Sequence, residues 1–294
     1  MIECVPNFSE GRDAVKVRAI VEAIGSAPGV LMLGWESDVD HNRSVVTFAG
    51  EPEAVLEGAI RGTAKAAEVV DLTHHQGVHP RVGAADVIPF APLEGATIEE
   101  CIEIAHRAGE EIWRKLKIPV YFYEAATRTP GRERLENVRR RGFDGKLPDL
   151  GDIAAHPTAG ASVVGARRLL IAFNLNLDTP EVAAARAIAH KIRESSGGFR
   201  YVKAMGRYLA SRDCAQISMN LTNFAETPLD RVYAQISEEA QRGGVKIRSR
   251  QIVGFVPRGA FEMAPDFFTR AENFEESRIL ETRIATIKAS AGQD

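Results

Sequence analysis

Hydrophobic and polar positions along the chain predict two successive passes of strands and helices. The first pass begins with a β-type run at Ile2–Asn7 and a turn at Ser9–Gly11, followed by apolar residues at helical spacing as far as Ile24. Its other expected elements are, in order, strands at Val30–Trp35 and Asn42–Ala49, a helix opened by Glu51 and Pro52, a strand at Asp86–Phe90, a helix at Thr97–Leu116 and a strand at Pro119–Tyr123.

The second pass repeats this order from Leu169 onward. Its expected elements are a strand at Leu169–Leu177, a helix at Thr179–Glu194, strands at Phe199–Met205 and Ala215–Leu221, a helix at Pro228–Arg242, a strand at Lys246–Val253 and a last amphipathic helix after Phe267. Each half approximates β-α-β-β-α-β, the split order that packs helices on one face of a mostly antiparallel sheet. We expect an α/β protein of the α+β sandwich type, with two similar ferredoxin-like subdomains at residues 1–166 and 167–294.

The connecting loop, residues 127–160, is rich in glycine, proline and charge. Its arginine run begins at Arg139, and we expect this run to be a solvated face because charge runs usually lie in water. The stretch Gly151–Ala161 is too long and too rich in Gly and Pro for a simple hinge. Long irregular segments inside compact domains are often functional loops.

Composition and net charge exclude several classes of protein. The 294 residues are 45% apolar and 26% charged, which excludes a fully disordered chain. The net charge of −3 argues against a general nucleic-acid coat, so an anionic ligand must be held by locally placed cations. The longest apolar runs are far shorter than the roughly 20 residues that span a bilayer. With three scattered cysteines and no signal-peptide pattern at the N-terminus, we expect a reduced, cytoplasmic, soluble protein without membrane partners.

Three histidines crowd into the loop His74–Ala84, and this loop is the first candidate site. Two glycines and Pro80 prevent a regular helix there. One interpretation is a metal site, because His75 and His79 stand four residues apart and Asp86 could add a carboxylate. A second is metal-free acid–base catalysis by His79, with Arg81 binding or orienting an anion. A purely structural loop is the third.

Two further polar clusters are weaker candidates. In Asp38–Ser44, either aspartate could orient an imidazole, His41 could titrate and Arg43 could hold a carboxylate bidentately, but an ordinary polar turn has the same pattern. In Val5–Gly11, a strand end meets a helix start, whose backbone N–H groups suit an anion. The chain has no P-loop, GxGxxG or GxSxG motif, so nucleotide and α/β-hydrolase functions lose their usual support.

Several of these segments together resemble the formiminotransferase family. The resemblance runs through essentially the whole chain in the same order, and the segments that carry it are Glu3–Arg12, Asn42–Gly50, His79–Phe90, Gly165–Leu177, Ala215–Asn223 and Gln251–Pro257. In animals this domain is fused to a cyclodeaminase domain. The present chain ends at Asp294 and resembles the stand-alone form, so we expect the second activity to be absent.

The resemblance implies a fold, a reaction and a set of site residues. It implies two α/β subdomains with a ligand cleft between them, and transfer of a formimino group from N-formimino-L-glutamate to N5 of tetrahydrofolate in histidine breakdown, without metal. The family motif HPR-x-GA-x-DV places the catalytic histidine at His79, and the folate-binding segment aligns with Gly151–Gly160. The expected substrate- and folate-binding residues are Asn7, Asp40, Asn42, Arg43, Arg81, Gly151, Pro157 and Gly160.

The residue types suit this chemistry, and rival functions stay open. One histidine can remove the N5 proton and protonate the departing glutamate amine, while Arg43, Arg81 and the segment Gly165–Arg168 suit the carboxylates of both substrates. If Arg81 binds an anionic substrate, Arg81→Ala raises its KM. Alternatives are formyl transfer between glutamate and tetrahydrofolate, a metal-dependent amidohydrolase using His74, His75 and His79, and a non-catalytic folate or amino-acid sensor. A homodimer is the expected oligomeric state.

Overall fold

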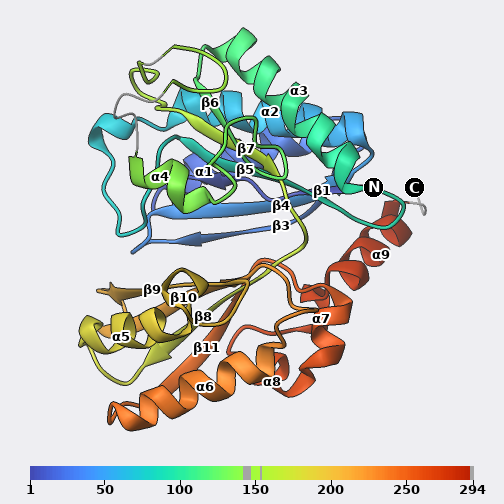
Figure 1. Ribbon diagram of the computed structural model, residues 1–294. Helices are drawn as coiled ribbons and strands as arrows, with labels where there is room; N and C mark the ends of the chain where they lie inside the picture. Colours follow the sequence, from blue (N-terminus) through green and yellow to red (C-terminus); the bar gives the residue numbers. More distant parts are fainter. Residues whose placement is uncertain (142–146, 153, 292–294) are drawn as a thin grey trace. The chain divides into compact units, whose positions relative to one another are not determined.

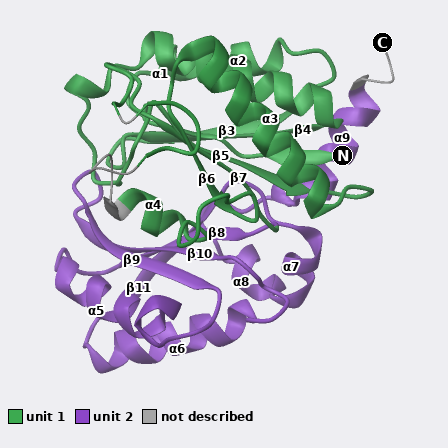
Figure 2. Cartoon of the chain, turned by 45° about the horizontal axis from the view of Figure 1, so that its top comes forward, with its two compact units in different colours: residues 1–168 green, residues 169–294 purple. Residues whose placement is uncertain are grey.

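The computed structural model describes residues 1–141, 147–152 and 154–291 of the chain. They form two compact units, residues 1–168 and 169–294, which are coloured separately in Figure 2. Each unit has one sheet, so the expectation of a mixed α/β protein with a sheet in each half is confirmed.

Unit 1 contains seven strands and four α-helices within the described residues (Figure 1). In chain order they are β1 (Ile2–Cys4), β2 (Asn7–Phe8), α1 (Ala14–Gly25), β3 (Leu31–Asp38), β4 (Arg43–Gly50), α2 (Pro52–Val69), β5 (Ala85–Pro92), α3 (Ile98–Leu116), β6 (Val120–Glu124), α4 (Leu135–Arg141) and β7 (Ser162–Ala166), with a 3₁₀ turn at Leu72–His74. Thr97 and Glu100 form a capping box at the start of α3, and this pair of residues marks the beginning of the helix in the sequence.

The first four strand positions of unit 1 follow the predicted split β-α-β order. β1 and β2 occupy one position between β4 and β5, and β3 pairs with the other side of β4, all antiparallel. The single strand expected at Ile2–Asn7 is divided in the structure, because Pro6 has no N–H to donate to a neighbouring strand. The sheet then continues beyond the expected pattern, since β7 pairs in parallel with both β5 and β6.

The two faces of this sheet bury different kinds of side chain. Helices α1, α2 and α3 cover one face, where the large core gathers around residues such as Phe8, Phe48 and Phe90. On the opposite face, Val138 of α4 packs with Val87, Tyr121, Tyr123 and Val163. Asn7, Arg43 and Asp86 of the candidate site also lie on this second face.

Unit 2 repeats the order of the first four strand positions. Its elements are β8 (Ile171–Leu177), α5 (Val182–Ile192), β9 (Val202–Leu209), β10 (Cys214–Leu221), α6 (Leu229–Arg242), β11 (Ile247–Val253), α7 (Arg258–Met263), α8 (Pro265–Thr269) and α9 (Leu280–Ala291), with 3₁₀ turns at Glu194–Ser196 and Glu276–Arg278. The sheet order is β11-β8-β10-β9, all antiparallel, and one face packs against α5 and α6 through a second core. The last helix expected after Phe267 is α9.

Both sheets have a register shift at the same place, between the first and fourth strand positions. In unit 1, Asn7 pairs with Val87 and Phe8 with Ala85, so Asp86 is the extra residue of a β-bulge. In unit 2, Asn176 pairs with Ser249 and Leu177 with Ile247, which leaves Arg248 in the corresponding position. Among the described residues, no helix combines the length and apolarity that crossing a membrane requires.

Candidate active site

The site begins where strands β2, β4 and β5 meet on the sheet face opposite α1–α3. Asn7 pairs with both Val45 and Val87, so its side chain shares their face, and Arg43 lies two residues before Val45 on that face as well. The bulge adds Asp86 next to Val87, and its contact with Arg43 places the carboxylate in the same group. Residues far apart in sequence are thus brought together by strand pairing.

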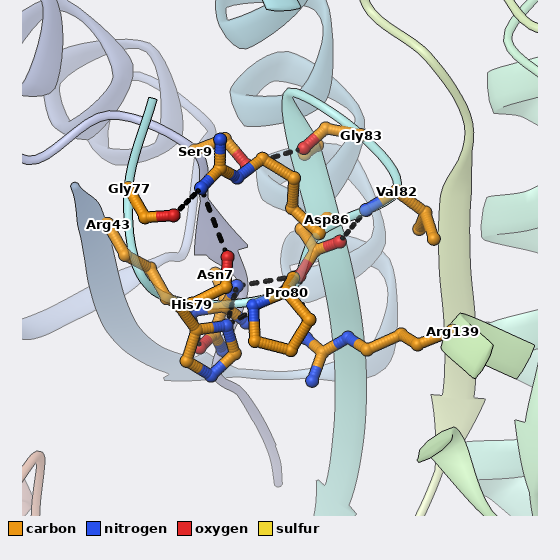
Figure 3. A network of polar contacts seen from close by, with 12 residues as sticks. Asn7, Ser9, Arg43, Gly77, His79, Pro80, Val82, Gly83, Asp86 and Arg139 are labelled. Carbon is orange, nitrogen blue, oxygen red and sulfur yellow. Dashed lines mark hydrogen bonds and ion pairs between the residues drawn. The ribbon is translucent and has the colours of Figure 1, made fainter. Parts of the chain in front are cut away.

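Asp86 is the centre of this group, and Figure 3 shows its partners. It is fully buried, and its Oδ2 accepts hydrogen bonds from Nη1 of Arg43 and Nη2 of Arg139, each at 2.6 Å. Its Oδ1 accepts the backbone N–H of Val82 at 2.6 Å. Burial raises the pKa of Asp86, but Arg139 and Arg43 outweigh burial and hold the pKa well below its ordinary value. The carboxylate is therefore ionised.

Arg43 links the carboxylate to the histidine. Its Nε donates to Oδ1 of Asn7 at 2.9 Å, while Nη1 lies 3.3 Å from Nδ1 of His79. Burial lowers the pKa of Arg43 to about 10, so the guanidinium remains protonated at neutral pH. A fixed positive charge therefore lies beside the imidazole.

The hydrogen bonds of His79 decide which ring nitrogen carries the proton. Nδ1 lies 2.8 Å from the carbonyl oxygen of Pro80, which can only accept, and 3.3 Å from Nη1 of Arg43, which can only donate. The shorter contact, with Pro80, favours the tautomer that carries its proton on Nδ1. Nε2 of the neutral ring then has an unprotonated lone pair. This tautomer presents a general base at the Nε2 end of the ring.

The surroundings also keep His79 neutral. Burial, then the positive charges of Arg43 and Arg139, lower the pKa of His79 well below its ordinary value, and they outweigh the opposite effect of Asp86. The imidazole is therefore in its neutral form at neutral pH. His41 lies nearby, with its ring centroid 5.7 Å from that of His79.

Arg81 organises the histidine loop itself. Its Nη2 donates to the carbonyl oxygens of Gly77 at 2.8 Å and His79 at 3.1 Å, and its Nη1 contacts Nδ1 of His75. Asn42 supports the same loop, because its Nδ2 donates to the carbonyl of Gln76 at 2.8 Å. The backbone of Asp40 also takes part, since its carbonyl accepts the Val78 N–H at 3.2 Å.

The far end of the loop packs against the segment that ends in Gly160. Val82 and Ala161 are joined by a backbone hydrogen bond of 2.9 Å, and Ala84 bonds to Ala159 at 2.9 Å. A Cβ on Gly83 would lie 1.7 Å from the Ala161 carbonyl oxygen, so only glycine allows this approach. Gly160 has a φ of +70°, which also favours glycine.

Most of the expected site residues come together in one region of unit 1. His79, Arg43, Asn7, Asn42, Arg81 and Asp40 belong to the contacts above, and Pro157 and Gly160 belong to the turn that packs beside Val82. Gly151 lies beside Trp113 and Pro119 instead. Within the expected folate-binding segment, residue 153 lies outside the described residues.

Two residues of the site were not assigned to it from the sequence. Asp86 was considered only as a metal ligand, although a lone carboxylate at the start of the apolar run Asp86–Phe90 is itself a sign of a buried charge that needs partners. The expectation of a solvated arginine run is wrong for Arg139, whose side chain is 12% exposed and ion-paired with Asp86. A helix, α4, carries Arg139 back to the sheet, which the composition of the segment does not indicate.

The geometry gives the metal interpretation little support. In the part of the chain that the structure describes, no group of three or more His, Cys, Asp or Glu side chains is arranged to hold a metal ion. Nδ1 of His79 is bonded to a carbonyl and Nδ1 of His75 contacts Arg81. The arrangement instead suits proton transfer at Nε2 of His79 beside a cationic group.

Comparison with known proteins agrees with the motifs that run through the site. Residues 1–167 match the formiminotransferase domain, N-terminal subdomain, and residues 172–289 match the formiminotransferase domain. The chain belongs to the formiminotransferase family. The resemblance inferred from the sequence is therefore confirmed.

Relatives of two architectures match the chain. It is 41% identical to a glutamate formimidoyltransferase of Streptococcus pyogenes serotype M1, with 97% of this chain and 98% of that protein aligned. It is 40% identical to a glutamate formimidoyltransferase of Thermoplasma acidophilum, with 97% of each chain aligned. A formimidoyltransferase-cyclodeaminase of Sus scrofa is 39% identical over 93% of this chain, but only 53% of that longer protein is aligned.

Proposed function

We propose that this protein is a glutamate formimidoyltransferase, which transfers the formimino group of N-formimino-L-glutamate to N5 of tetrahydrofolate. The products are 5-formimidoyltetrahydrofolate and L-glutamate. The observation that carries the proposal is the end-to-end similarity, at about 40% identity, to two proteins of that name. The geometry of His79 supports it, because the reaction needs one group that both accepts and donates a proton.

We assign the acid–base role to Nε2 of His79. The N5 lone pair of the reduced pterin attacks the formimino carbon, the π pair of the C=N bond moves onto the formimino nitrogen, and Nε2 accepts the N5 proton as the tetrahedral adduct forms. The imidazolium then protonates the glutamate nitrogen, the C–N bond to glutamate breaks, and the amine leaves. The lone pair of the formimino nitrogen re-forms the C=N bond when the glutamate amine is expelled. The Pro80 carbonyl holds Nδ1–H throughout, so the same nitrogen serves both steps.

The positive charges around His79 influence its protonation state during the cycle. Because Arg43 and Arg139 disfavour the imidazolium, His79 starts neutral and returns its proton readily to the leaving amine. Arg43 also attracts a carboxylate of the donor. Tetrahydrofolate enters the proposal as a co-substrate, and no step requires a metal ion.

Several finer features remain part of the proposal. We assign folate binding to Gly151, Pro157, Gly160 and the rest of the segment Gly151–Gly160, and donor binding to Asn7, Asp40, Asn42, Arg43 and Arg81. A ligand cleft formed with the second subdomain, the boundary at residue 166, a homodimer and a cytoplasmic location are predictions of the same kind.

Turnover of N-formimino-L-glutamate with tetrahydrofolate by the wild type and by His79→Ala tests the proposal. We expect kcat of the variant to fall about 10²- to 10⁴-fold, with tetrahydrofolate affinity little changed. His190→Ala, an exposed histidine on α5, is the matched control and should retain full activity. Comparable turnover by wild type and His79→Ala would refute the assigned role.

The same assay separates the proposed donor from the formyl alternative. The reacting centres differ only in C=NH against C=O, and the geometry of His79 suits both. N-formimino-L-glutamate with tetrahydrofolate, and 5-formyltetrahydrofolate with L-glutamate, should be compared at equal concentrations. We expect the larger kcat/KM for the formimino donor, and the reverse order would make formyl transfer the main reaction.

A further inference from the structure

Arg139 has no role in the proposed function beyond its electrostatic effect on His79, yet its environment is unusual. It comes from α4, which lies between β6 and β7 of unit 1, and its guanidinium reaches Asp86 on the sheet. Figure 3 shows Arg43, His79 and Arg139 converging around Asp86. Arg139 is therefore a second buried arginine at a carboxylate that already forms an ion pair with Arg43.

The charges around Asp86 do not balance. Two guanidiniums share one carboxylate, and both bind the same oxygen, Oδ2. The other oxygen is occupied by a neutral backbone N–H. Because His79 is neutral, Arg43, Asp86 and Arg139 carry one net positive charge, with side-chain exposures of 10%, 0% and 12%. Buried charge is generally paired, so this group is suited to bind an anion.

The hydrogen bonds of Arg139 are also incomplete. A guanidinium has five N–H donors, and one nitrogen of Arg139, Nη2, donates to Asp86. Its Nε is buried without a hydrogen-bond partner among the described residues. Buried donors are generally hydrogen-bonded, so this N–H group is suited to an acceptor from a ligand. A carboxylate supplies two acceptor oxygens in a geometry that matches a guanidinium.

Arg81 differs from Arg139 in this respect. Its Nη1 and Nη2 are directed to His75 and to the loop carbonyls of Gly77 and His79. These contacts make it a residue that shapes the loop. The unsatisfied donor beside His79 is on Arg139.

We propose that Arg139, together with Arg43, binds a carboxylate of the amino-acid donor and so places its one-carbon group at Nε2 of His79. The inference rests on the proposed function for the identity of the donor. It assigns a substrate-binding role to a residue of α4. Asp86 then holds the two guanidiniums together and orients them, while a ligand carboxylate neutralises their excess charge.

Arg139→Gln tests this role, because it removes the charge and keeps a side chain that can pack in the same place. We expect KM for N-formimino-L-glutamate to rise about 10- to 100-fold, the range of a charge-assisted hydrogen bond, with kcat changed much less. The dissociation constant of L-glutamate, measured by calorimetry, should rise in parallel. KM for tetrahydrofolate should stay within about threefold.

Two further variants complete the experiment. Arg134→Gln alters an exposed arginine just before α4 and should leave both constants unchanged. Arg139→Lys keeps the charge without the planar fork and should give an intermediate KM. If Arg139→Gln does not fold, as judged by circular dichroism, the comparison of wild type with Arg139→Lys decides, and equal glutamate affinity would refute the inference.

The outcomes separate the inference from the proposed function. Glutamate binding does not require turnover, so it is informative even if the wild type fails to transfer a formimino group, a result that would overturn the proposed function alone. Wild-type turnover with unchanged donor KM and glutamate affinity in Arg139→Gln would overturn the inference alone. A loss of kcat at unchanged KM and glutamate affinity would also overturn it, because Arg139 would then act only by positioning His79.

Discussion

The guanidinium of Arg43 and the carboxylate of Asp86 meet at 2.6 Å although 43 positions separate them along the chain. Arg43 begins β4, and Asp86 is the extra residue of the bulge in β5. The ion pair therefore depends on the sheet, and the orientation of His79 in turn depends on the pair.

Replacing Asp86 by Asn should destabilise the protein strongly. The variant leaves two buried guanidiniums without a counter-charge, and breaking a buried pair in this way costs about 3–5 kcal/mol. Urea unfolding measures the change in free energy. Glu22→Gln, an exposed acid on α1, should change it by less than about 0.5 kcal/mol.

The destabilisation should depend on pH in a defined direction. The pKa of Asp86 is lower in the folded protein than in the unfolded chain, where it is about 3.9. Its ionisation therefore stabilises the fold above that pH, and the contribution is lost as pH falls. The stability difference between wild type and Asp86→Asn should shrink below pH 4, and a constant difference would contradict an ionised Asp86.

The acid limb of the pH–rate profile should lie below the ordinary range for histidine. Because burial, Arg43 and Arg139 lower the pKa of His79, the neutral base persists to pH values well below about 6.5. In Arg43→Gln one of these charges is removed, so the pKa of His79 should move upward. Titration of the His79 ring resonances by NMR checks both statements, and a downward or absent shift in the variant would show that Arg43 does not influence the ring.

Arg81→Ala distinguishes two roles for this arginine. Substrate binding, as the sequence suggests, predicts a higher KM for the anionic substrate. The contacts with His75, Gly77 and His79 predict instead a lower kcat, because the loop that orients the imidazole loses its support. Steady-state kinetics on both substrates separate the roles, and we expect the main effect in kcat.

Gly83→Ala should prevent the loop from closing on its neighbour. An added Cβ would lie 1.7 Å from the backbone carbonyl oxygen of Ala161, and backbone on both sides leaves little room to shift. We expect a loss of several kcal/mol in stability and of most activity, as for other severe steric clashes. Gly259→Ala in α7, where an added Cβ would lie 3.9 Å from the ring of Phe224, should be tolerated. Normal stability of Gly83→Ala would mean that the two segments are not in contact.

Much of the fold was predictable because it depends on local signals. Apolar residues at helical spacing located α1, and a run rich in β-branched residues located β4. β7 was not predicted, although its buried sequence Ser162–Ala166 reads as a short apolar run of the kind found inside parallel sheets. Such a run has no alternation and so does not reveal whether it is a strand.

The candidate site was predictable only in part for the same reason. The residues around His79 form recognisable motifs, and the motifs alone indicated the family and an imidazole base. The roles of Asp86 and Arg139 were hidden, because one is re-aimed by a bulge and the other is carried to the sheet by α4. Neither the bulge at Asp86 nor the packing of α4 against the sheet produces a periodic pattern in the sequence.

The amino-acid sequence by itself determined the alternation of strands and helices and the two matched halves, and its motifs indicated His79 as the candidate acid–base group, since these depend on residues close together in the chain. Only the tertiary structure decided the tautomer of His79, the charge balance around Asp86 and the place of Arg139. Those properties arise from burial and from contacts across strands, which bring distant charges within a few ångströms of each other in a medium where they are only weakly screened.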